Sequence, residues 1–221
     1  MFPCRETIAA VASGAGQCAV CLIRVSGPDC LPVLHRVFPG LAGGALQPQP
    51  RHAYVSNALD PDAGDTVDQC VVTFFRGPES YTGEDLLEIG CHGGRVTPRR
   101  VLSALLSAGC RLADPGEFSK RAFLNGKLGL AEAEAVSSLI TANSDLAQRN
   151  ALRQLEGRLG RTAETLACRL RQALVHLEAS LDFEEEEVPS IQPDDLLVTL
   201  DDCAASAQSL ADTWEFGHAL Q

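Results

Sequence analysis

The chain has 221 residues, of which 45% are hydrophobic, and a formal net charge of −11 at pH 7. This length suffices for two modest domains with a core each. Neither a secretory signal nor an apolar run near the ~20 residues of a membrane helix is visible, so we expect a cytoplasmic protein with no membrane partner. The acidic balance argues against a protein that holds nucleic acid through a basic face of its own.

The first half of the chain has the pattern of a mixed sheet with flanking helices, which is an α+β fold. Strands are expected where apolar and β-branched residues run together, and helices where apolar residues recur every three or four positions. The expected strands cover residues 7–12, 19–26, 52–58, 67–75, 86–91 and 111–113, and the expected helices cover 30–37 and 97–108. A turn at 60–65 predicts that the strands on either side of it are antiparallel neighbours.

Two charged residues interrupt apolar strands of this sheet. Arg24 has an apolar residue on each side, so the two-residue period of a strand puts its side chain on the opposite face from theirs. It either faces solvent or points into a pocket, where a guanidinium can hold a carboxylate at two places. Glu88 is flanked in the same way. It either faces water at a sheet edge or meets N–H donors in a pocket, because an unpaired buried carboxylate is costly.

Three other features each suggest a known kind of site, for phosphate, for metal or for catalysis, but the sequence lacks the further residues that such a site needs. The loop at 13–17 has two glycines that permit a tight turn, yet no lysine or helix follows to hold a phosphate. Cys18 and Cys21 have the spacing of metal ligands without a second pair, and the cysteine count of nine is odd, so we expect buried thiols instead of zinc or a disulfide framework. His92 lacks an identifiable nucleophile and orienting partner, so we interpret it as a turn residue and expect no catalytic residue.

A short segment joins this half to a helical second half. Asp114, Pro115 and Glu117 are expected to begin a helix as N-cap, first helical residue and capping-box carboxylate. Asn125–Gly126 is expected to end it, because either residue tolerates the left-handed turn that follows a helix. Lys127 comes next, and by itself it has the character of a solvated surface lysine.

The second half has the period of long helices throughout. One helix is expected over 130–142, and a last one from 193 to about 216. Between them, Ser144 is expected to cap a helix that runs to about residue 182, a rod of about 57 Å at 1.5 Å per residue, in which Gly157 and Gly160 are points where it can bend. The acidic run at 184–187 is expected to be a solvated linker.

The joining segment resembles a motif of the MnmE (TrmE) family of tRNA-modification GTPases. The matching residues are Pro115-Gly116-Glu117-Phe118, Arg121-Ala122-Phe123-Leu124-Asn125-Gly126-Lys127 and Ala133-Glu134-Ala135. The likeness extends over nearly the whole chain, through residues 6–10, 23–28, 80–85, 88, 92–94 and 179–187. We therefore expect the fold and the ligands of that family.

The resemblance implies a division into two domains. Residues 1–116 would form an α/β domain that dimerises and binds a tetrahydrofolate derivative, in the 5-formyl or the 5,10-methylene form, and residues 117–221 would form the first part of a helical domain. By their positions in the family's motifs, Arg24, Glu88 and Lys127 look like the folate contacts. Glu88 would accept hydrogen bonds from the pterin, and the two cations would meet carboxylate or carbonyl oxygens of the folate.

The resemblance also implies a Ras-like G domain, inserted after about residue 217, that binds GTP and potassium. With an MnmG-type FAD protein, the family modifies carbon 5 of the wobble uridine of certain tRNAs. No GxxxxGK[ST] phosphate loop occurs in the 221 residues, so we expect no GTP hydrolysis by this chain alone, and tRNA to be reached through the complex. Two alternatives stay open, a freestanding folate-dependent aminomethyl (one-carbon) transferase and a non-catalytic scaffold.

Overall fold

The computed structural model describes residues 6–14, 16, 18–41, 48–182 and 193–218. Its contacts divide the chain into two units, residues 1–128 and 129–221. Helix α3 (Glu117–Leu124), which forms most of the joining segment, lies in the first unit, whereas the expected division at 116/117 falls before it. The joining segment therefore belongs to the sheet-containing unit.

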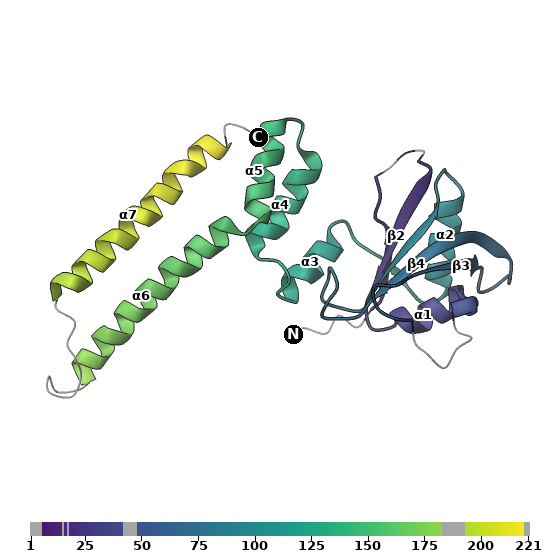
Figure 1. The fold of residues 1–221 in the computed structure, drawn as a ribbon, viewed down its shortest axis with the longest axis horizontal. Helices are drawn as coiled ribbons and strands as arrows, with labels where there is room; N and C mark the ends of the chain where they lie inside the picture. The colour runs from purple at the N-terminus through teal and green to yellow at the C-terminus, as the bar shows by residue number, and fades with distance from the viewer. Residues whose placement is uncertain (1–5, 15, 17, 42–47, 183–192, 219–221) are drawn as a thin grey trace. The chain divides into compact units, whose positions relative to one another are not determined.

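The first unit is built on a six-stranded mixed sheet with the strand order β3-β4-β5-β2-β1-β6 (Figure 1). Neighbouring strands are antiparallel, except that β1 and β6 run parallel. The expected fold class is confirmed, with each strand close to its predicted place. The strands are β1 (Ile8–Val11), β2 (Val20–Ser26), β3 (Ala53–Leu59), β4 (Thr66–Phe75), β5 (Leu86–His92) and β6 (Arg111–Leu112).

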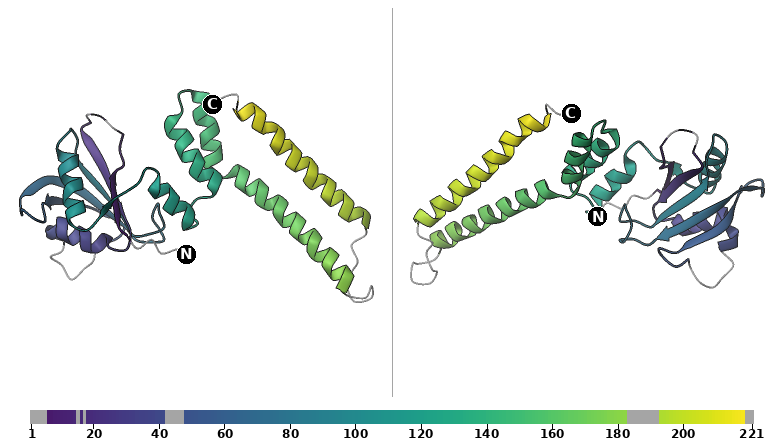
Figure 2. Two further views of the ribbon diagram at one scale, coloured as in Figure 1. Left: turned by 180° about the vertical axis from the view of Figure 1, so that it is seen from behind. Right: turned by 45° about the horizontal axis from the view of Figure 1, so that its top comes forward.

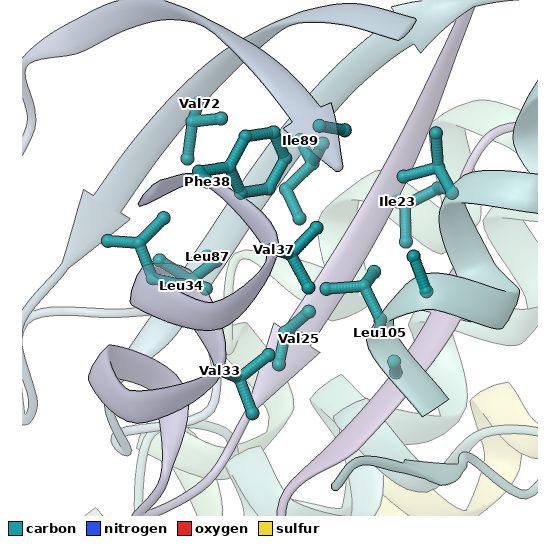
Figure 3. Close-up of a cluster of buried hydrophobic side chains, with 14 of the residues drawn as sticks. Ile23, Val25, Val33, Leu34, Val37, Phe38, Val72, Leu87, Ile89 and Leu105 are labelled. Atoms are coloured by element: carbon teal, nitrogen blue, oxygen red, sulfur yellow. The ribbon is translucent and has the colours of Figure 1, made fainter. Parts of the chain in front are cut away.

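Two helices, α1 (Cys30–Val37) and α2 (Thr97–Ser107), pack against one face of this sheet and enclose its core, and a short 3₁₀ turn, η1 (Pro39–Leu41), follows α1. Figure 3 shows this core, in which side chains of the sheet meet side chains of both helices. Every second residue of β2 is buried here, including Ile23 and Val25. Arg24 between them lies on the opposite face, as its position in the strand predicts.

The opposite face of the sheet is less apolar and more exposed. Val55, Val71 and Val20 are exposed there, on β3, β4 and β2. Arg24 and Glu88 share this face, because their strands are in register with each other. The sheet thus presents its charged pair on the side away from the core.

The described cysteines of the sheet unit, from Cys18 onward, are free thiols, and most of them belong to the core. Cys21, Cys70 and Cys91 are buried on three adjacent strands. Burial raises the pKa of Cys70 and that of Cys91 to about 12, so both are neutral near pH 7. This confirms for Cys21, Cys70 and Cys91 the prediction that they pack as small hydrophobic side chains. The same prediction was wrong for Cys18, which is exposed because it precedes β2 and lies outside the core.

The start of α3 differs from the prediction. Gly116, not Asp114, is the N-cap, with φ 76° and ψ 2°. The Glu117 N–H donates to the Asp114 carbonyl at 3.0 Å, so Pro115 and Gly116 form the centre of a type II β-turn, in which glycine supplies the positive φ. The predicted roles of Asp114 as a side-chain cap and Pro115 as the first helical residue were wrong, because a Pro-Gly pair stabilises this turn better than a helix start. Glu117 does accept from the Asp114 N–H, at 2.8 Å.

The end of α3 confirms the prediction. Asn125 is the C-cap and Gly126 follows with φ 71°. The Lys127 N–H donates to the Ala122 carbonyl at 2.8 Å and the Gly126 N–H to the Phe123 carbonyl at 3.0 Å, which is the hydrogen-bond pattern of a Schellman motif. The backbone of Lys127 is therefore fixed by the helix terminus.

The second unit is entirely helical within its described residues. Helices α4 and α5 contact each other, and α6 and α7 run side by side in both views of Figure 2. Arg169 and Asp202 form an ion pair at 3.2 Å between α6 and α7. The helices are α4 (Leu130–Thr141), α5 (Asp145–Leu155), α6 (Arg158–Asp182) and α7 (Pro193–His218).

The predicted single helix from Ser144 to residue 182 was wrong. Ser144 does cap α5, where its Oγ accepts from the Ala147 N–H at 3.2 Å. However, α5 ends at Leu155, and α6 begins after Gly157, whose φ of 71° lies outside the helical region. Gly157 therefore ends a helix instead of bending one.

Two further expectations concern this unit and the whole chain. The acidic run at 184–187 lies outside the described residues. Within the described part of the chain, no helix combines the length and the apolar character that a membrane span requires.

Candidate functional site

Arg24 and Glu88 form an ion pair across β2 and β5. They are directly opposite in the antiparallel register, and the carboxylate Oε1 accepts from Arg24 Nε at 2.9 Å and lies 2.7 Å from its Nη2. The two side chains are 28% and 27% exposed. The structure thus brings together two of the three predicted residues, and each lies in a partly sheltered place instead of facing bulk water alone.

Tyr81 extends this pair. The guanidinium carbon of Arg24 lies 5.0 Å from the centroid of the Tyr81 ring, within the range of a cation–π interaction. The Tyr81 hydroxyl lies 2.9 Å from Ser119 Oγ on α3. Sequence reasoning noted Tyr81 only as part of a motif; an aromatic residue inside a Gly-rich loop was the signal that could have singled it out.

Lys127 lies beside the same loop that carries Tyr81. A Cβ placed on Gly83 would lie 3.2 Å from Lys127 Cγ, so the lysine stem rests against this glycine. Asn125 Nδ2 donates to the Thr82 carbonyl at 2.7 Å and fixes the end of α3 to the loop. Lys127 is exposed, and within the described residues its ammonium makes no hydrogen bond or ion pair. It therefore joins Arg24 and Glu88 through the loop and not by direct contact.

A buried arginine lies behind this loop. Arg121 is 2% exposed and contacts the carboxylates of Glu84 and Glu117, each at 3.0 Å. Arg111 binds Glu117 from the other side, at 2.7 and 3.1 Å. Burial of the Glu117 carboxyl opposes its ionisation, but the hydrogen bonds from Arg111, from the Asp114 N–H and from Arg121 lower its pKa to about 2. Sequence reasoning missed Arg121 and Glu84, although both belong to the motifs that it quoted.

A cavity of about 310 Å³ lies at the N-terminal turn of α3. Its lining includes Arg111, Asp114, Lys120 and Leu124, so it mixes charges of both signs with an apolar wall. Arg24, Glu88 and Lys127 are not among its lining residues. The cavity and the candidate ligand contacts are therefore different places on the first unit.

His92 was predicted to be a turn residue, but it is the last residue of β5, paired with Val20, on the same sheet face as Glu88. Asp68 holds it twice: Oδ1 lies 2.8 Å from His92 Nδ1, and Oδ2 accepts from the His92 backbone N–H at 2.7 Å. Partial burial tends to raise the pKa of Asp68, but these hydrogen bonds outweigh it and lower the pKa. The ring itself is 73% exposed. The orienting carboxylate was missed from the sequence, because β4 and β5 neighbour each other only in the fold.

Two family models match the chain. The first is described as "GTP-binding protein TrmE N-terminus" and covers residues 7–127, and the second is described as "MnmE helical domain" and covers 130–221. The chain belongs to the MnmE (TrmE) family. The two matches meet where the contacts divide the chain, at Leu128 and Gly129.

Similar proteins from several bacteria carry the name "tRNA modification GTPase MnmE". The chain is 45% identical to that of Symbiobacterium thermophilum over 83% of its length, 42% identical to that of Akkermansia muciniphila over 98%, and 43% identical to that of Stutzerimonas stutzeri over 91%. It spans only 40%, 47% and 43% of those relatives, respectively. The likeness therefore concerns less than half the length of these relatives.

Proposed function

We propose that this chain is the folate-binding and first helical portion of an MnmE-type tRNA-modification GTPase. In this proposal its first unit supplies the site for a tetrahydrofolate one-carbon donor, in the 5-formyl or the 5,10-methylene form, which is used to modify carbon 5 of a wobble uridine. The observation that carries the proposal is the Arg24–Glu88 pair, held partly sheltered on the face away from the core and linked through one loop to Lys127.

The charges at this place suit a pterin with a polar tail. Both contacts of the pair use Oε1 of Glu88, so neither occupies Oε2, which can accept hydrogen bonds from the amino and ring N–H groups of a pterin. Arg24 and Lys127 supply N–H donors and positive charge for carboxylate or carbonyl oxygens of the folate. Glu88 and Arg24 lie together, and Lys127 lies at Gly83 of the neighbouring loop, so acceptor and donor groups are available for both ends of such a ligand.

The partners of the whole protein follow from the family. We assign homodimerisation to the first unit, where the sheet face opposite α1 and α2 carries the exposed apolar residues Val20, Val55 and Val71, and catalysis of uridine modification to a complex with an MnmG-type FAD protein. tRNA binding belongs to that complex, since this chain is acidic. GTP and potassium belong to a Ras-like domain of the family and not to these residues. We place the protein in the cytoplasm.

Calorimetry with 5-formyltetrahydrofolate tests the proposal. We expect binding heat for the chain and weaker binding, with a higher Kd, in Arg24→Ala, Glu88→Ala and Lys127→Ala. Arg51→Ala is the matched control, because Arg51 also pairs with a glutamate, Glu79 at 2.9 Å, on the surface of the same unit. No heat with the unchanged chain, or equal heat in all variants, would contradict folate binding at this site and leave the scaffold alternative.

The one-carbon transferase alternative needs a separate assay. A freestanding transferase would turn over a methylene-folate donor by itself, whereas the proposed role requires the partner protein and tRNA. We therefore expect no turnover of 5,10-methylenetetrahydrofolate by the isolated chain with a simple amine acceptor. Turnover that is lost in Glu88→Ala would favour the transferase.

A further inference from the structure

One loop, Ser80–Asp85, connects all the residues of the candidate site. Its Tyr81 lies against the guanidinium of Arg24, which in turn holds Glu88. Its Gly83 supports the stem of Lys127. The loop therefore contacts both the Arg24–Glu88 pair and the stem of Lys127.

The loop is anchored by a carboxylate that points inward. Glu84 Oε2 accepts from Ser26 Oγ at 2.8 Å and from Arg121 Nη1 at 3.0 Å, and the Glu84 side chain is only 15% exposed. The Thr82 hydroxyl, which is fully buried, lies 2.7 Å from Ser26 Oγ and accepts from the Glu84 N–H at 3.3 Å. Polar groups without a partner are costly in such a place, so these bonds fix the loop in one conformation.

Arg121 ties the same anchor to α3. Its Nη1 also donates to the Glu6 carbonyl at 3.0 Å, and its Nη2 donates to Glu117 Oε1 at 3.0 Å. This guanidinium therefore joins the N-terminal segment, the loop and the helix whose end carries Lys127. A buried ion pair is weak as a source of stability, because well-packed apolar residues of similar volume often do as well. The buried ion pairs of Arg121 are better explained by a need to hold the loop and α3 in one defined arrangement.

We propose that Glu84 and Arg121 are positioning residues of the candidate site. They hold Ser80–Asp85 so that Tyr81 stays against Arg24 while Gly83 stays against Lys127. The effect on ligand affinity rests on the proposed folate-binding function, whereas the effect on loop geometry does not. Two experiments separate these consequences.

The first experiment measures folate affinity by calorimetry in Glu84→Gln. The amide keeps the size of the side chain but removes the charge that faces Arg121. We expect the Kd for 5-formyltetrahydrofolate to rise about tenfold, equal to about 1.4 kcal/mol. The control is Glu79→Gln, which removes a charge just before the same loop. The Glu79 side chain is 72% exposed, so this variant is expected to leave the Kd unchanged.

A double-variant comparison distinguishes positioning from general damage. If Glu84 acts by placing Lys127, then Glu84→Gln has a much smaller effect on the Kd when Lys127 is already replaced by Met, because coupled residues are not additive. An equal fold-change with and without Lys127 would overturn the proposal for affinity. Circular dichroism of each variant checks that the fold is retained.

The second experiment needs no ligand. With fluorotyrosine in place of both tyrosines, the ¹⁹F resonance of Tyr81 is assigned with Tyr81→Phe, and Tyr54 serves as the internal control. We expect Arg24→Met to shift the Tyr81 resonance in the unchanged chain but not in Glu84→Gln, where the ring has left the guanidinium. The same shift in both backgrounds would overturn the positioning role. Absence of folate binding together with the expected shifts would contradict the proposed function alone.

Discussion

Gly83 and Lys127 are in direct contact although they belong to a loop and to the end of a distant helix. A Cβ on Gly83 would lie 3.2 Å from Lys127 Cγ and 3.0 Å from Asn125 Cβ, and the φ of Gly83 is 77°. Two independent conditions therefore require glycine here, a positive φ and the close approach of α3. The absence of a side chain lets the lysine lie beside the loop that carries Tyr81.

Gly83→Ala is expected to weaken folate binding as well as to destabilise the fold. A positive φ costs an alanine about 1–2 kcal/mol, and the added methyl also displaces the Lys127 stem. Gly64→Ala is the matched control, because Gly64 has nearly the same φ, 75°, but open space around its Cβ position. Urea unfolding and calorimetry decide: both variants lose stability, and only Gly83→Ala raises the Kd. Equal Kd values in the two variants would contradict the role of the contact.

The bond between Tyr81 and Ser119 predicts a pair of variants with the same effect. Tyr81→Phe and Ser119→Ala each remove one end of the 2.9 Å hydrogen bond. Each is expected to lower the free energy of unfolding by about 0.5–1.5 kcal/mol, and the double variant by little more than one of them. Thermal unfolding of the four proteins measures this. Additive losses would mean that the two hydroxyls stabilise the unit independently.

The sequence was sufficient to place Arg24 and Glu88 on the face away from the core. Both interrupt apolar strands, and the two-residue period of a strand fixes their side. Their pairing could not be derived, because it depends on β2 and β5 being neighbours in register although α1, β3 and β4 lie between them in sequence. Glu84 and Arg121 escaped notice for the same reason: nothing local indicates that two charged residues meet inside the protein.

The helix boundaries show a different limit of sequence reasoning. Leucines continue at helical spacing on both sides of Gly157, and glycine inside a helix costs only about 1 kcal/mol relative to alanine, so the local pattern permits one long helix. In the structure, Gly157 has φ 71° and separates α5 from α6. Pro115–Gly116 was ambiguous in a similar way, because Pro occurs both at a helix start and in a turn. Packing of the rest of the chain decides such cases.

Arg121→Met is expected to destabilise the first unit strongly. The substitution keeps the apolar volume but leaves the carboxylates of Glu84 and Glu117 without their buried partner, which typically costs about 3–5 kcal/mol. Arg171→Met is the control, because its ion pair with Glu164 is exposed on both sides and contributes about 0.5 kcal/mol or less. Urea unfolding followed by circular dichroism measures the difference.

The same substitution can be partly rescued. Adding Glu84→Gln to Arg121→Met removes the carboxylate charge that has lost its arginine partner, whereas Glu117 keeps its ion pair with Arg111. Stability is therefore expected to recover in part in this double variant, since the penalty comes from unpaired charge and not from lost volume. No recovery in the double variant would mean that the loss of stability does not come from the unpaired Glu84 carboxylate.

The ionisation of Glu117 predicts how stability changes in acid. Burial of this carboxyl tends to raise its pKa. Hydrogen bonds from Arg111, from the Asp114 N–H and from Arg121 outweigh burial and lower the pKa from 4.5 to about 2 in the folded protein. A carboxyl with a lowered folded-state pKa contributes stability that is fully present above its unfolded pKa, and this is lost as the pH falls through the folded value. The contribution is at most about 3 kcal/mol.

The difference between the unchanged chain and Glu117→Gln isolates this contribution from the other carboxyls. The gap in the free energy of unfolding is expected to be constant from pH 7 to about pH 5 and to shrink as the pH falls from about 4.5 toward 2. Urea unfolding at a series of pH values measures the gap. A gap that stays constant down to pH 2.5 would mean that Glu117 titrates alike in the folded and unfolded chains, and that its bonds to Arg111 and Arg121 do not favour the ionised form.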